Sequence, residues 1–112
     1  MENVNPQEQI RAEFAHAAQA RARGNEGQTR VCARRAAGIA AHEYFARRAR
    51  IVHTPSAYDL LNLLAADPAL SEELRQIAAH LTLRVDAEFK LPPDIDLIAE
   101  AQKLCDELLK QG

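Results

Sequence analysis

With 112 residues and a formal net charge of −2, the chain has room for one domain with a single modest core. It holds 22 alanines and 13 leucines, no tryptophan and few β-branched residues, so the composition predicts an all-α fold and excludes a β-sheet protein. No apolar run approaches the roughly 18 residues of a membrane span, and residues 1–4 do not resemble a signal peptide. We therefore expect a cytoplasmic protein with no membrane partner.

Signals for helix ends divide the N-terminal half of the chain. Asn5 followed by Pro6 is typical of a helix start, and Gly24 is suited to end that helix. The turn at residues 24–27 is so short that the next helix is predicted to run antiparallel to the first.

The segment from residue 28 to residue 50 is predicted to be the central helix. Its middle is almost entirely small or apolar, and the apolar positions do not keep to one stripe, which is typical of a helix buried on several sides. Gly38 lies among alanines there. Because glycine costs roughly 1 kcal/mol against alanine inside a helix, we expect another helix to pack closely at this position. Glu43 and Arg47 are four residues apart and are predicted to pair.

The C-terminal half contains three further helix signals. Ser56 is predicted to cap a short helix over about 57–66, and Ser71 to cap a fourth helix with a regular apolar stripe. Asp94 and Asp96 are expected to open a last helix that runs to the C-terminus.

No internal repeat and no break in composition divides the chain. The sequence therefore predicts one domain over residues 1–112: an all-α, single-domain bundle of about five helices, built on the alanine-rich central helix 28–50.

The charge is divided unevenly along this bundle. Residues 1–56 carry nine arginines and five glutamates, a balance of +4, whereas residues 57–112 carry five basic and eleven acidic residues, a balance of −6. Two explanations stay open: basic and acidic elements neutralise each other inside the fold, or the arginines form an anion-binding surface.

Arg30, Arg34 and Arg35 are the candidate anion or nucleotide contacts. They lie at one end of the apolar middle of the central helix, and the guanidinium group is a planar fork suited to phosphate. His42 lies within the apolar middle. Its two interpretations are a hydrogen-bonded histidine of the core and a group that faces a ligand.

Metal and nucleotide-loop motifs are absent from the sequence. No two histidines or cysteines lie three or four residues apart, and the four glycines form neither GxxxxGK nor GxGxxG. We therefore expect no metal and no cofactor. Cys32 and Cys105 are predicted to be free, buried thiols.

The order of the helices resembles the HEPN domain (higher eukaryotes and prokaryotes nucleotide-binding). The stretches that carry the resemblance are ARARGNEGQTRVCARRAAGIAAHEYF, SAYDLLNLL, SEELRQIAAHLTLRVDAEFKLPPD and IDLIAEAQKLCDELL. The resemblance implies a helical bundle that forms a homodimer. Some members of the family are ribonucleases and others partner a small nucleotidyltransferase, so RNA, a nucleotide or such an enzyme is the implied partner.

The ribonuclease branch of this family carries an arginine followed after four to six residues by a histidine. Arg75 and His80 fit that spacing and are the candidate catalytic pair of a metal-independent, toxin-type ribonuclease. However, every histidine in the chain has an arginine at this spacing, and Gln76 stands where the nuclease motif favours Asn, Asp or His. The leading prediction is therefore a non-enzymatic binding module. A ribonuclease and a structural helical protein without a small-molecule ligand are the alternatives.

Overall fold

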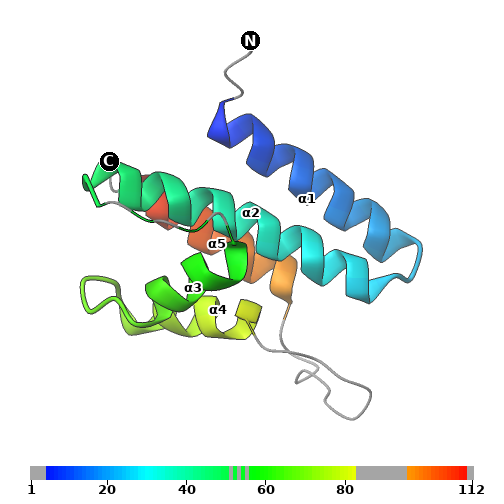
Figure 1. Ribbon diagram of the computed structural model, residues 1–112. Coiled ribbons are helices and arrows are strands. Elements are labelled where there is room, and N and C mark those ends of the chain that lie inside the picture. Colours follow the sequence, from blue (N-terminus) through cyan, green and yellow to red (C-terminus); the bar gives the residue numbers. More distant parts are fainter. Residues whose placement is uncertain (1–4, 51, 53, 55, 83–95, 111–112) are drawn as a thin grey trace.

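The computed structural model describes residues 5–50, 52, 54, 56–82 and 96–110. Over these residues the chain forms five helices and no strand, so the predicted all-α bundle is confirmed (Figure 1). The helices are α1 (Pro6–Ala22), α2 (Glu26–Arg47), α3 (Ala57–Ala65), α4 (Glu72–Thr82) and α5 (Leu97–Lys110).

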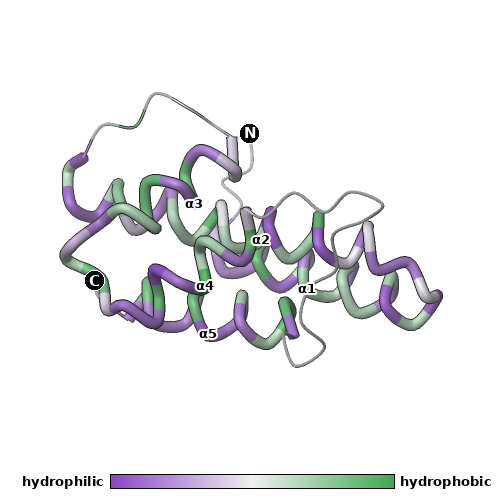
Figure 2. Tube along the Cα trace, turned by 90° about the horizontal axis from the view of Figure 1, so that it is seen from below, coloured by the Kyte–Doolittle hydropathy of each residue, from purple (hydrophilic) through white to green (hydrophobic). Residues whose placement is uncertain are grey.

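Helix α2 is the centre of the bundle, as predicted. It packs against all four other helices, and α1 packs against it in the antiparallel sense (Figure 1). Its buried residues lie on several sides and include Cys32, Ala36, Ala40, Tyr44 and Phe45. Along α4 and α5 polar and apolar residues alternate instead, as expected for helices with one buried face (Figure 2).

The start of α2 corrects the predicted boundary at residue 28. The side chain of Asn25 accepts a hydrogen bond from the backbone N–H of Gln28 at 3.0 Å, so Asn25 is the N-cap and the helix begins at Glu26. Gly24 has a φ of 76° and ends α1, as predicted. Three residues, 23–25, therefore join α1 to α2, rather than four.

The end of α2 also differs from the predicted residue 50. The helix ends at Arg47 because Ala49 adopts a left-handed conformation with a φ of 54°. The backbone N–H of Arg50 then donates to the carbonyl oxygen of Phe45 at 3.0 Å, which is the pattern of a Schellman motif.

The predicted caps of the later helices are confirmed where the structure describes them. The hydroxyl of Ser56 accepts a hydrogen bond from a backbone N–H in the first turn of α3, at 3.3 Å. The hydroxyl of Ser71 accepts one from a backbone N–H in the first turn of α4, also at 3.3 Å. Asp96 accepts the N–H groups of Ile98 and Ala99 at the start of α5. Asp94, the other residue expected to open this helix, lies outside the described residues.

Candidate functional site

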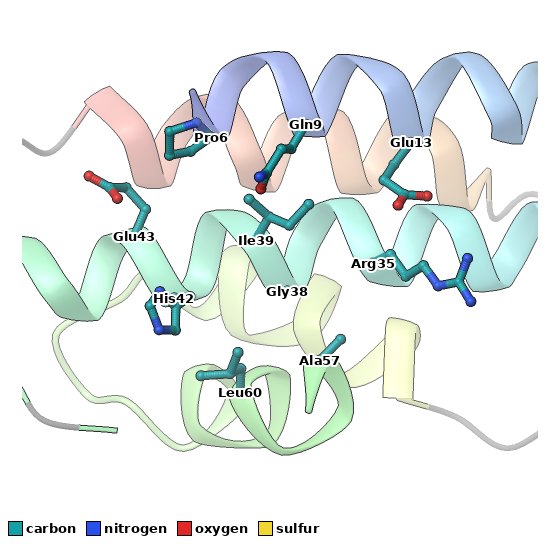
Figure 3. A pocket seen from close by; sticks show the side chains of 10 residues that line it. All are labelled: Pro6, Gln9, Glu13, Arg35, Gly38, Ile39, His42, Glu43, Ala57 and Leu60. Atoms are coloured by element: carbon teal, nitrogen blue, oxygen red, sulfur yellow. The ribbon is translucent and has the colours of Figure 1, made fainter. Parts of the chain in front are cut away.

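An open groove with a volume of about 610 Å³ runs across α1, α2 and α3 (Figure 3). Helix α2 forms its floor, while α1 and the start of α3 form its walls. Ten residues line the groove: Pro6, Gln9, Glu13, Arg35, Gly38, Ile39, His42, Glu43, Ala57 and Leu60.

The floor of the groove is polar at both ends and apolar between them. Arg35, Ile39 and His42 share one face of α2 because they are spaced four and three residues apart. Arg35 and His42 are both exposed, and their separation of seven positions corresponds to about 10 Å along the helix axis. Ile39 and Leu60 supply apolar surface in the groove.

Charge on the floor is concentrated at Arg35. No hydrogen bond or ion pair joins Arg35 or His42 to any residue in the described part of the chain. Glu43 also lines the groove, but one of its carboxylate oxygens lies 2.9 Å from Nε of Arg47, as predicted for this pair. Among the described residues, Arg35 is thus a cation of the groove without a partner, whereas Glu43 is paired with Arg47.

The α1 wall supplies two polar side chains that the sequence did not single out. Figure 3 shows Gln9 and Glu13 reaching from α1 toward α2, with Glu13 at the same end of the groove as Arg35 and His42 at the other end. Oε1 of Glu13 is buried and has no hydrogen-bond partner among the described residues. An unpaired buried carboxylate oxygen is costly, so a donor that reaches it is strongly favoured.

The structure separates the three arginines that the sequence grouped. Arg34 is half-buried and its Nε donates to the carbonyl oxygen of Leu81 at 2.8 Å. That oxygen belongs to the last turn of α4, whose carbonyls have no partner within the helix. Arg35 is rotated by about 100° around α2 and faces the groove instead. Arg30 is half-buried and does not line the groove.

The interpretation of His42 as a core histidine is wrong. The side chain is exposed and lines the groove, because α1 covers the neighbouring side of α2 and leaves this position open. Of the three arginines and His42, the structure therefore places Arg35 and His42 in the same groove, at its two ends.

Other arginines of the basic half stabilise the fold. Arg47 donates to the carbonyl oxygen of Leu109 at 2.8 Å, near the end of α5. The guanidinium of Arg48 lies 4.0 Å from the ring centre of Tyr44, and that of Arg50 lies 4.8 Å from the ring centre of Phe45. Part of the arginine excess in residues 1–56 therefore makes contacts within the bundle.

Helix α1 is also tied to α5 by charge. Arg21 donates to the carboxylate of Asp96 at 3.0 Å. This hydrogen bond from Arg21 lowers the pKa of Asp96 and raises the pKa of Arg21.

Arg75 and His80 line separate hollows of α4. Nδ1 of His80 lies 2.8 Å from a carboxylate oxygen of Glu100 on α5, beside Lys103. Arg75 lines a second hollow with Glu72, and its Nε is buried without a hydrogen-bond partner among the described residues. The two side chains thus face different surroundings.

The cysteines are free and buried, as predicted. Burial raises the pKa of the Cys105 thiol to about 12, so this thiol is not a nucleophile near neutral pH. Within the described residues, no group of histidines, cysteines and carboxylates is arranged to hold a metal ion. None of the described helices is long and apolar enough to cross a membrane.

Comparisons of the chain with protein-family models, with curated proteins and with solved structures found no significant match. The groove across α1, α2 and α3 is therefore the main basis for a functional proposal.

Proposed function

We propose that the protein is a non-enzymatic, HEPN-like binding module that holds a nucleotide in the groove across α1, α2 and α3. The observation that carries this proposal is the pair of exposed side chains, Arg35 and His42, on the floor of one groove. Neither has a partner in the part of the chain that the structure describes. Each is therefore available to a ligand.

The form of the groove suits a ligand with two polar ends and a less polar middle. Its volume of about 610 Å³ falls within the range of about 300–1,000 Å³ that small-molecule sites occupy. Ile39 and Leu60 offer apolar surface between Arg35 and His42. A nucleotide fits this description, because its base and its phosphate are polar ends joined by the less polar ribose.

A binding role has more support than ribonuclease activity. Catalysis requires a cation and a general acid or base that converge on one phosphate. Arg75 and His80 line different hollows, and His80 is engaged with Glu100. A homodimer and a small nucleotidyltransferase as partner are what the HEPN resemblance adds to this proposal.

Titration of the purified protein with nucleotides tests the proposal. The probes are the 5′-monophosphates of guanosine, adenosine, cytidine and uridine, followed by calorimetry. At least one of them is expected to bind, and Arg35→Gln should weaken binding about tenfold or more, because hydrogen bonds from a charged group are the strong ones.

Arg11→Gln is the matched control, because Arg11 is exposed on α1 and does not line the groove. It removes the same charge and should leave the affinity nearly unchanged. No binding by the wild type, or equal losses in the two variants, would contradict a nucleotide site in the groove.

A further inference from the structure

Of the two acidic groups that line the groove, Glu13 is the one whose carboxylate has no partner in the described part of the chain. Oε1 is buried and receives no hydrogen bond from the described residues, and no ion pair joins Glu13 to Arg35 on the facing helix. Glu43, the other acid of the groove, is already paired with Arg47. A ligand in the groove is therefore favoured if it supplies hydrogen-bond donors to Glu13.

This requirement orients a nucleotide in the groove. A phosphate placed beside Glu13 would be repelled by the carboxylate, because two like charges in contact are unfavourable. The phosphate is therefore expected at the opposite end, where Figure 3 shows His42 and where the carboxylate of Glu43 is already paired with Arg47. The base is then expected at the end that holds Glu13 and Arg35.

The four common bases differ in the donors they offer to a carboxylate. Guanine presents N1–H and the N2 amino group side by side, so both oxygens of one carboxylate can accept. Adenine and cytosine place a ring nitrogen acceptor beside their amino group, and uracil flanks its N–H with two carbonyl oxygens. In these three bases a lone pair of the base would face a lone pair of Glu13.

Arg35 complements this edge of guanine. Next to N1–H on the guanine ring lie two acceptors, O6 and N7. The guanidinium group of an arginine is the usual hydrogen-bond partner of O6 and N7. Glu13 and Arg35 lie at the same end of the groove on facing helices, so an acceptor and a donor group are presented together.

We propose that Glu13 and Arg35 select guanine, and that the ligand of the groove is a guanine nucleotide whose phosphate lies at His42. This inference rests on the proposed nucleotide site and adds the identity of the base and the direction of the ligand. Glu13 is then the residue that determines specificity.

The test compares 5′-monophosphates that differ only in the base. The wild type should bind the guanosine nucleotide about tenfold or more tightly than the inosine nucleotide, which lacks the N2 amino group. It should also discriminate against the xanthosine nucleotide, whose C2 carbonyl oxygen faces the carboxylate. In Glu13→Gln the preference for the guanosine over the xanthosine nucleotide should be reversed. The amide N–H of glutamine donates to the C2 carbonyl oxygen of xanthine, while the amide oxygen still accepts from N1–H.

A gain of affinity for the xanthosine nucleotide in Glu13→Gln is an outcome that a damaged fold cannot produce. Nucleotides that all bind with similar affinity, unaltered in rank by Glu13→Gln, would overturn the selection of guanine and leave the proposed site intact. If no nucleotide binds to the wild type, the proposed function and this inference both fail.

The direction of the ligand has its own readout. Removing the phosphate, by using guanosine in place of its 5′-monophosphate, should weaken binding to the wild type. It should weaken binding to His42→Gln much less, because that variant has already lost the phosphate contact. An equal loss in both proteins would overturn the assignment of the phosphate to His42.

Discussion

Gly38 of α2 and Ala57 of α3 touch where the two helices cross. A Cβ atom added at Gly38 would lie 2.5 Å from Cβ of Ala57 and 2.9 Å from its Cα, which is closer than real Cβ contacts. Both residues also line the groove, so this contact sets how near α3 lies to the groove floor. The close packing predicted from the glycine is confirmed.

Gly38→Ala is therefore expected to destabilise the protein by overpacking, by about 1–3 kcal/mol. Gly27→Ala is the matched control in the same helix, because its added Cβ meets only Asn25 Oδ1 at 3.7 Å. That variant should gain up to about 1 kcal/mol from helix propensity. Denaturant unfolding measures both, and a Gly38→Ala variant as stable as Gly27→Ala would contradict the close contact.

Arg34 is expected to contribute to stability rather than to binding. Arg34→Gln removes the donor that reaches Leu81 and should cost about 1 kcal/mol, the usual net worth of such a hydrogen bond. Arg35→Gln, one residue further, should leave the free energy of unfolding nearly unchanged, because its side chain has no partner in the described structure. Thermal unfolding of the two variants checks this contrast, and equal destabilisation would refute the division of roles.

Ala49 offers a stabilising substitution. Its φ of 54° is unfavourable for a residue with a Cβ atom, whereas glycine adopts it freely. Ala49→Gly should stabilise the protein by about 1 kcal/mol, and Gly24→Ala at the equivalent position of α1, with a φ of 76°, should destabilise it by a similar amount. Chemical denaturation measures the free energy of unfolding of both variants. If both change it in the same direction, the backbone conformation at these positions is not the cause of the change.

The contact between Arg21 and Asp96 predicts a dependence of stability on pH. Because the folded state lowers the pKa of Asp96, the contribution is present above the unfolded value of about 3.9 and is lost as pH falls through the folded value. Arg21→Gln should raise the pKa of Asp96 toward its ordinary value. Carboxyl titration of Asp96 by NMR measures this shift, and an unchanged pKa would mean that Arg21 does not engage it in solution.

Local signals in the sequence predicted the starts of α1, α3 and α4 but not the start of α2. Asn5, Ser56 and Ser71 act within their own first turns, so their roles need no knowledge of the tertiary fold. The end of α2 was missed because an alanine, Ala49, takes the left-handed position that glycine usually occupies. Sequence patterns do not reveal such an exception.

The candidate site was only partly predictable for a different reason. Arg35 and His42 were among the candidates, but the role of Arg34 depends on where the end of α4 lies. Glu13 was missed because its position matters only when α1 folds back antiparallel on α2 and places it in the groove. Spacing along one helix carries no information about the helix that faces it.

The central claim is that the groove across α1, α2 and α3 holds a nucleotide. Its most direct test is a titration of isotope-labelled protein with guanosine 5′-monophosphate, followed by backbone amide NMR shifts. The account predicts that the largest shifts fall at Gln9, Glu13, Arg35, Ile39 and His42. Shifts centred on His80 and Glu100, or no shifts at millimolar nucleotide, would contradict it.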